Sequence, residues 1–160
     1  MNNYRKFVID LLIPFFRRDE RYYLLVGDMG FGAIDRIKTE FPERIINCGI
    51  MEQGTAGIAA GMSLGGLIPI FYSIVNFLAY RALEQIRNDV VLQNLNVKFI
   101  GTGANNYFKM LGNSHCCGDD DVKIMQLIDM KVYDPYSSEK NFEELLNDWM
   151  TDERAGYLRV

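Results

Sequence analysis

Short apolar runs alternate with helix-period patterns along nearly the whole chain. Runs rich in β-branched and aromatic residues, bounded by Gly, Asn or Asp, predict six strands. These are 22–27, 44–48, 68–72, 97–101, 131–134 and 156–160. Apolar spacings of three or four residues predict helices between them, at 31–40, 52–64, 80–94, 121–128 and 138–150. The apolar run 7–16 predicts a further amphipathic helix before the first strand.

Two of these helices differ in character. The helix 80–94 has one clear apolar face, which carries Leu83, Ile86, Val90 and Val91. The helix 52–64 is instead rich in Ala and Gly, and Gly costs about 1 kcal/mol relative to Ala inside a helix. Such a small-sided helix permits close approach, either by the sheet of the same domain or by another subunit.

Strands that alternate with helices predict a parallel sheet with right-handed crossovers. We therefore expect an α/β fold, a three-layer sandwich with a mainly parallel six-stranded sheet, in a single domain over 1–160. Open sheets of this kind bind ligands beyond the carboxyl ends of their strands. This rule selects the loops 28–32, 49–53, 73–77 and 101–118.

Charge and cysteine content narrow the function. The net charge of −4 and the lack of any Lys/Arg block argue against nucleic acid and membrane surfaces as partners. Asp10 and Pro14 interrupt the run 7–16, which is too short to span a membrane and resembles no leader peptide. Three cysteines, two of them adjacent, form no disulfide framework, so we expect a reduced cytoplasmic protein without zinc.

Several polar or aromatic residues in the selected loops have both a plain and a functional interpretation. Taken alone, Glu52 is a first-turn carboxylate that compensates a helix dipole at the surface, and Phe77 is ordinary core. His115 is the only histidine, and a single His in a Gly-rich loop is as readily structural as functional. The run 119–121 is typical of a helix cap or solvated face rather than a metal site. The cysteine pair 116–117 has no paired base, so we assign it no chemistry.

The order of motifs changes these interpretations. The segment 44–53 reads Arg-Ile-Ile-Asn-Cys-Gly-Ile-Met-Glu-Gln and runs into the Ala/Gly-rich helix. It resembles the Gly-Ile-x-Glu-Gln segment shared by transketolases and deoxyxylulose-phosphate synthases. The match continues without a gap through 69–97, with Ser-Ile-Val-Asn-Phe at 73–77, Tyr80, and Gln-Ile-Arg-Asn-Asp at 85–89. It covers nearly the whole chain and resembles the pyrimidine-binding domain of these thiamine-diphosphate enzymes.

This resemblance implies a cofactor site. Glu52 corresponds to the carboxyl that hydrogen-bonds a ring nitrogen of the cofactor's aminopyrimidine, and Phe77 to the aromatic that stacks on that ring. Ile74 and Tyr80 correspond to neighbouring walls, although transketolases often place another aromatic where Ile74 stands. The expected cofactor is thiamine diphosphate, which carries out the carbanion chemistry while the protein binds and shapes it. We expect Glu52→Gln to leave folding intact and to remove most turnover.

The same resemblance assigns a second catalytic residue. The loop 111–118 is similar to the family's Asp-Gly-x-Thr-His segment, which implies that His115 faces the substrate as a proton donor or hydrogen-bond partner. Leu111 stands where the family has Asp, and Ser114 replaces Thr. Loss of that carboxylate removes a usual contact with substrate hydroxyls, so we expect an atypical sugar.

Asp28 resembles the start of the superfamily's Gly-Asp-Gly…Asn metal motif. Met29 breaks that motif, and Asn47 follows too early to complete it. We therefore assign no metal ligand in this chain. Asp28 is expected near the cofactor at a subunit interface, with a strand-end cap as the equal alternative.

The incomplete motif implies a partner. We expect a diphosphate-binding subunit, like the N-terminal section of a split transketolase, to hold magnesium and complete the site in a heterotetramer or self-associating dimer. The predicted reaction transfers a two-carbon ketol unit between sugars or sugar phosphates. One alternative is a subunit of a 2-oxo acid decarboxylase or a deoxyxylulose-phosphate-synthase-like enzyme. Another is a non-catalytic interaction module with the same fold.

Overall fold

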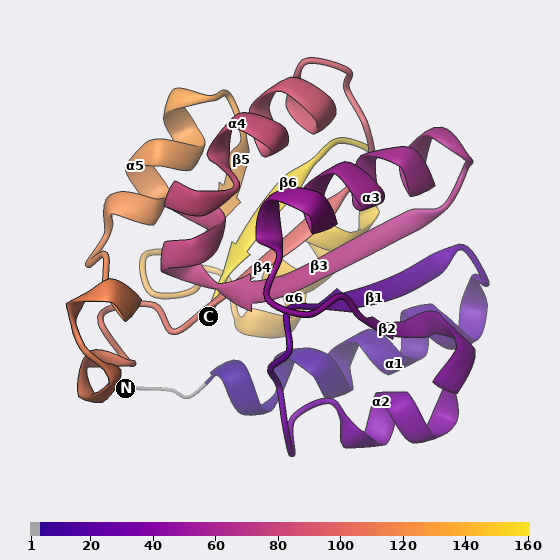
Figure 1. The fold of residues 1–160 in the computed structure, drawn as a ribbon. Coiled ribbons are helices and arrows are strands. Elements are labelled where there is room, and N and C mark those ends of the chain that lie inside the picture. Colours follow the sequence, from indigo (N-terminus) through magenta and orange to yellow (C-terminus); the bar gives the residue numbers. More distant parts are fainter. Residues whose placement is uncertain (1–3) are drawn as a thin grey trace.

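A six-stranded sheet forms the centre of the computed structural model, which describes residues 4–160 (Figure 1). The strand order is β2-β1-β3-β4-β6-β5, and each neighbouring pair is parallel. The sheet is therefore wholly parallel, where the sequence predicted a mainly parallel one. The strands are β1 (Tyr22–Val26), β2 (Ile45–Asn47), β3 (Ile68–Ile74), β4 (Lys98–Thr102), β5 (Lys131–Tyr133) and β6 (Gly156–Arg159).

Helices connect the strands. The α-helices are α1 (Val8–Arg18), α2 (Asp35–Glu40), α3 (Glu52–Leu64), α4 (Leu83–Gln85), α5 (Asp120–Leu127) and α6 (Phe142–Thr151). Short 3₁₀ helices are η1 (Tyr4–Lys6), η2 (Pro42–Arg44), η5 (Lys109–Leu111) and η6 (Asn113–His115), and two π-helical segments are η3 (Phe77–Arg81) and η4 (Ile86–Val91). The bounds of α3 agree with the prediction, whereas the predicted helix 80–94 is a composite of η3, α4 and η4.

Two predicted helices begin later than expected. The segment before α2 turns through Gly30 and Gly32, whose φ values of 87° and 78° are incompatible with an α-helix. Helix α6 begins at Phe142 because Asn141 and Glu144 form a capping box, in which each side chain accepts a bond from the other's backbone N–H.

The inner strands β1, β3, β4 and β6 are mostly buried because helices cover both faces of the sheet. Leu24 and Val26 pack in a cluster with α1 and α6, which includes the fully buried Trp149. Leu25, between them in sequence, packs on the opposite face with α3, η3, η4 and α5. Figure 1 shows these two helical layers on either side of the sheet, so the predicted three-layer sandwich is confirmed.

The order in which the chain adds strands to the sheet changes sides at β1. It passes from β1 to the edge strand β2, then returns through α3 to the other side of β1. The carboxyl ends of β1 and β3 therefore flank a topological switch point, where open α/β sheets bind their ligands. Among residues 4–160, no helix has the length and apolar character needed to cross a membrane.

Candidate functional site

Glu52 begins α3, and its side chain lies at the switch point. The side chain is only 1% exposed. The Ser73 hydroxyl, near the end of β3, donates to Oε1 of Glu52 at 3.4 Å. A Cβ atom added to Gly27, directly after β1, would lie 3.8 Å from the same oxygen. The interpretation of Glu52 as a surface residue is therefore wrong, because the carboxylate is buried between two strand ends.

Arg81 neutralises this buried carboxylate. Its Nη1 donates to Oε2 of Glu52 at 2.6 Å. Its Cζ also lies 4.1 Å from the centre of the Phe77 ring, within the range of a cation–π interaction. Arg81 was not among the residues predicted to form the site. Its position four residues after Phe77, on the same side of a helical turn, was the available signal.

Phe77, which lies under the Arg81 guanidinium, also contacts His115. Their rings meet edge to face, with centroids 5.1 Å apart. The His115 loop is held in place because Asn76 Nδ2 donates to the Ser114 carbonyl at 2.5 Å. Ser114 Oγ and His115 Nδ1 lie 3.1 Å apart, which orients the imidazole. Glu52 and the two rings thus form one continuous group through Arg81.

Ile74 and Tyr80, the two residues predicted to form walls of the cofactor site, lie in different environments. Ile74 is buried in a small apolar cluster against which Phe77 packs, as a wall residue requires. Tyr80 is 53% exposed, and its hydroxyl donates to the Asp120 carboxylate of α5 at 2.9 Å. That hydrogen bond is the main cause that raises the pKa of Tyr80. The structure therefore brings Ile74, but not Tyr80, together with Phe77.

Asp28 links the ends of β1 and β2. Its N–H donates to Asn47 Oδ1, and Asn47 Nδ2 donates back to Asp28 Oδ1, both at 3.0 Å. Asn47 Oδ1 also accepts from the Gly49 N–H at 2.9 Å, which shapes the turn into α3. Asp28 is exposed and has a φ of 50°. This is the geometry of a strand-end cap, and the early position of Asn47, which breaks the metal motif, is what allows it.

The acidic run 119–121, at the start of α5, differs from its prediction. Asp121 is fully buried, and it accepts hydrogen bonds from Tyr157 Oη at 2.8 Å and from Arg159 Nε at 2.9 Å. The interpretation as a cap or solvated face is therefore wrong for Asp121. Asp119 occupies the cap position but makes no side-chain cap bond. Within the described part of the chain, no three His, Cys, Asp or Glu side chains gather as a metal-binding group.

The adjacent cysteines differ in environment. Cys117 is buried, and burial, reinforced by the nearby Asp121 charge, raises its pKa to about 12. Cys116 is partly exposed. A thiol with so high a pKa carries almost no thiolate at neutral pH, so Cys117 is a structural residue.

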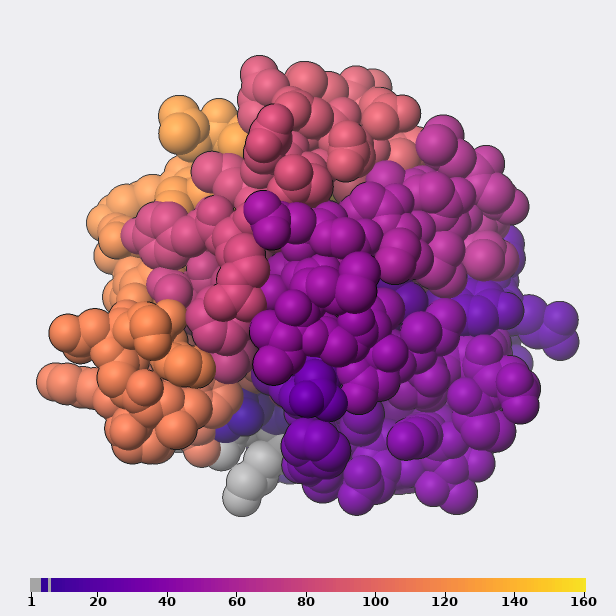
Figure 2. Space-filling view, in the orientation of Figure 1, coloured from indigo at the N-terminus to yellow at the C-terminus, as the bar shows by residue number. Residues whose placement is uncertain are grey.

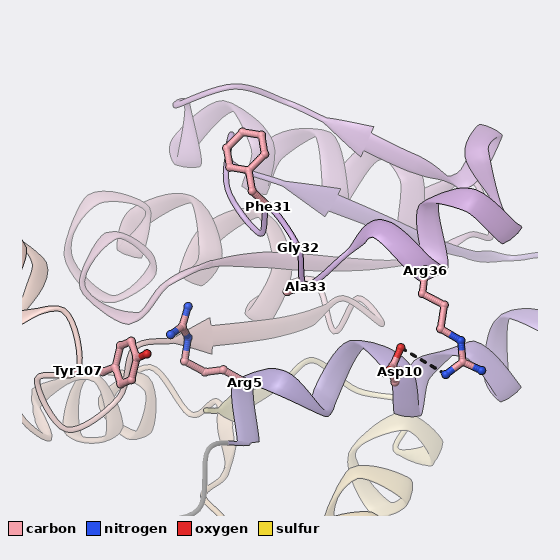
Figure 3. A pocket seen from close by; sticks show the side chains of 7 residues that line it. All are labelled: Arg5, Asp10, Phe31, Gly32, Ala33, Arg36 and Tyr107. Atoms are coloured by element: carbon pink, nitrogen blue, oxygen red, sulfur yellow. Dashed lines mark ion pairs between the residues drawn. The ribbon is translucent and has the colours of Figure 1, made fainter.

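A separate cavity of about 500 Å³ lies beside the first helix (Figure 3). Phe31, Arg36 and Asp10 line it together with Arg5 and Tyr107. The Arg5 guanidinium is already engaged, because it donates to Thr102 Oγ1 at 2.7 Å and lies over the Tyr107 ring.

The loop segment 103–118, which carries His115, forms a lobe at the lower left of Figure 2.

An open, wholly parallel α/β sheet with a buried carboxylate beside its switch point is an architecture in which many enzymes bind their ligands. The particular family follows from sequence comparison. The chain belongs to the family described as "Transketolase, pyrimidine binding domain", which it matches over residues 2–155.

Characterised relatives include subunits of transketolases. The chain is 33% identical over 132 residues to "6-deoxy-6-sulfo-D-fructose transketolase subunit SqwH" of Clostridium sp. (strain MSTE9), covering 81% of this chain and 41% of that protein. It is 36% identical over 98 residues to a subunit of apulose-4-phosphate transketolase of Actinobacillus succinogenes, covering 61% and 32%. It is 35% identical over 109 residues to 1-deoxy-D-xylulose-5-phosphate synthase of Bacillus mycoides, covering 68% and 17%.

A solved structure described as "Split gene transketolase, inactive beta4 tetramer" shares the fold. Its TM-score is 0.82 at 29% identity, and the similarity covers 97% of this chain and 49% of that one. The chain spans less than half the length of each of the three curated relatives named above.

Proposed function

We propose that this chain is the pyrimidine-binding part of a thiamine-diphosphate-dependent, transketolase-like enzyme that transfers a two-carbon ketol unit between sugars or sugar phosphates. The observation that carries the proposal is the buried Glu52 carboxylate at the switch point, joined to the Phe77 ring by one planar N–H donor. A protonated aminopyrimidine is also planar and also carries N–H donors. The residues present therefore fit this half of the cofactor.

Each side chain has a distinct role in this proposal. Glu52 accepts a hydrogen bond from the pyrimidine ring, and Phe77 stacks against it with Ile74 behind. His115, at the edge of Phe77, faces the substrate and donates or accepts a proton there. Bound thiamine diphosphate supplies the carbanion chemistry. Asp28 near the cofactor and Tyr80 as a wall remain predictions, and the Tyr80–Asp120 hydrogen bond speaks against the second.

The diphosphate and magnesium are assigned to a partner. Two relatives carry the word "subunit" in their names, which supports a split enzyme assembled as a heterotetramer or a self-associating dimer. The partner is a diphosphate-binding subunit that holds magnesium with a complete Gly-Asp-Gly…Asn motif. The three cysteines of this chain are free, which supports the expected cytoplasmic location.

Calorimetry tests cofactor sharing. Thiamine diphosphate and magnesium are titrated into this chain alone and into the complex with a co-expressed chain that carries the metal motif. We expect tight binding only by the complex. Tight binding by this chain alone would contradict a cofactor shared between two chains.

Glu52→Gln tests the site itself. The amide is almost isosteric, and Arg81 is 39% exposed and can be solvated, so the fold is retained. We expect kcat of the assembled enzyme to fall by about 10²–10⁴-fold, the usual worth of a proton-handling group. Circular dichroism checks the fold, and near-normal turnover would refute the assignment.

A second candidate reaction follows from the similarity to deoxyxylulose-phosphate synthase. That enzyme class and two-subunit oxo-acid decarboxylases act on 2-oxo acids instead of ketose donors. Product analysis of the assembled pair with ketose donors and with pyruvate separates the two. No cofactor-dependent product from either would favour a non-catalytic interaction module.

A further inference from the structure

The Arg81 guanidinium fills the space between Glu52 and Phe77. It donates to Oε2 of Glu52 at 2.6 Å, and its Cζ lies 4.1 Å from the centre of the Phe77 ring. One planar cation thus meets the buried carboxylate and the aromatic face at once.

These two contacts are the ones proposed above for the aminopyrimidine. A guanidinium and an aminopyrimidine both offer a flat π-face to an aromatic ring and N–H donors to a carboxylate. One face of Phe77 cannot hold both groups together. The geometry points to Arg81 as a placeholder, which occupies the pyrimidine position in the cofactor-free protein and is displaced when the cofactor binds. This inference rests on the proposed function.

In the cofactor-free protein, the buried Glu52 carboxylate needs a cationic partner. Glu52 is 1% exposed, and an ionised carboxylate without a partner is strongly unfavourable at such burial. Arg81 enters from the surface, with 39% of its side chain exposed. It can therefore leave the site without carrying a buried charge through the protein interior.

A hollow beside Arg81 offers room for the guanidinium when it leaves Glu52. This hollow of about 600 Å³ is lined by Arg81, Glu84 and Gln85, among others. Glu84 is exposed, and Gln85 Oε1 is buried without a hydrogen-bond partner among residues 4–160. Both follow Arg81 by three or four residues, the spacing at which helical side chains meet. A guanidinium turned outward can pair with the exposed Glu84 as it gives up Glu52.

Displacement of Arg81 lowers the apparent affinity for the cofactor. If the open arrangement is populated in about one molecule in ten, the apparent Kd is raised about tenfold over the intrinsic one. Removing the guanidinium removes this competition. It also leaves the Glu52 carboxylate without a cationic partner in the cofactor-free protein, with only the Ser73 hydroxyl as donor.

The test compares Arg81→Met with the wild-type chain. In the assembled enzyme we expect Arg81→Met to lower the Kd of thiamine diphosphate, measured by calorimetry with magnesium, by up to about tenfold. In the full chain without cofactor we expect a lower Tm than the wild type. Adding Glu52→Gln to that variant removes the unpaired charge, so we expect this double variant to recover the Tm.

A matched control and a milder variant complete the design. Arg21→Met removes an exposed pair with Asp19 just before β1, at the opposite end of the sheet, and should leave the Kd unchanged. Arg81→Lys keeps the charge without the planar face. If Arg81→Met does not fold, the Kd of thiamine diphosphate is measured with Arg81→Lys instead. Weaker cofactor binding in the Arg81 variant, or an unchanged Kd, would overturn the placeholder role. Absence of binding by the wild-type complex would instead refute the proposed function, and the placeholder with it.

Discussion

Asp121 and Arg159 form an ion pair that is almost completely withdrawn from water. Arg159 Nε donates to Asp121, and its Nη2 donates to the Gly118 carbonyl at 2.7 Å. The Tyr157 hydroxyl donates to the same carboxylate, and burial together with the Asp121 charge raises the Tyr157 pKa well above its ordinary value. The network ties β6 to the start of α5, which a local reading of three adjacent acids could not reveal.

Arg159→Met should be strongly destabilising, because it leaves Asp121 buried and unpaired. We expect the free energy of unfolding to fall by about 3–5 kcal/mol, measured by urea denaturation. Lys123→Met removes only exposed pairs with Asp119 and Asp120, so it should change stability little. Equal effects of the two variants would contradict a structural role for the buried pair.

The two adjacent cysteines should react at different rates. Burial and Asp121 raise the pKa of Cys117 to about 12, so its reactive thiolate is scarce at pH 8. We expect iodoacetamide to modify the partly exposed Cys116 first, as followed by peptide mass spectrometry. In guanidinium chloride the difference should disappear. Faster labelling of Cys117 in the folded protein would contradict its burial.

At the scale of elements, the segment after β3 departs from the regular helix that was predicted. Its core positions recur every fourth residue, at Leu78, Ala82, Ile86 and Val90, and all four are buried. In an α-helix of 3.6 residues per turn, that spacing drifts by about 40° at each step. The wider π-helical turns of η3 and η4 correct the drift and keep the stripe on the sheet.

Asn76, at the start of this segment, should control the mobility of the His115 loop. Its side chain donates to the Ser114 carbonyl at 2.5 Å. We expect Asn76→Ala to accelerate hydrogen exchange in residues 112–118 and to lower kcat of the assembled enzyme several-fold, with protection of β1 unchanged as the internal control. Unchanged exchange in the loop would show that other contacts hold it.

Features set by the local sequence pattern could be predicted, whereas contacts set by the strand order could not. The bounds of α3 follow from its composition, and the central strands β3 and β4 follow from runs that are buried on both faces. The burial of Glu52 depends on the strand order, because β1 and β3 become neighbours only when β2 lies at the edge. The pairing of Arg81 with Glu52 joins residues 29 positions apart. No spacing rule within one element predicts such a contact.

At the scale of the whole molecule, Asp152 joins the last three elements. It accepts hydrogen bonds from Lys131 and Tyr133 of β5, at 3.0 Å each, and from the Arg154 N–H before β6. Burial favours a higher pKa for Asp152, but the bonds from the Arg154 N–H and from Lys131 and Tyr133 outweigh it and hold the pKa well below the usual range. The backbone carbonyl of Asp152 also accepts from the buried Lys98 of β4.

This arrangement predicts an acid-side loss of stability. A carboxyl whose pKa is depressed by folding stabilises the protein above its unfolded pKa of about 3.9, and that contribution is lost as pH falls toward the folded pKa. We expect Asp152→Asn to cost about 1.5–3 kcal/mol at pH 7. Below pH 4 the two proteins should converge, as measured by urea denaturation across pH. A difference that does not change with pH would contradict this linkage.

The single tryptophan has a practical consequence for all of these titrations. Trp149 is 0% exposed, and its Nε1 donates to the Gly156 carbonyl. It lies in the α1/α6 layer, on the other side of the sheet from α3 and its carboxylate. The fluorescence of Trp149 should therefore report unfolding of the core, and it should not respond directly to a ligand that binds near Glu52. A spectral change on adding cofactor to the complex would report chromophores of the other subunit or a rearrangement that crosses the sheet.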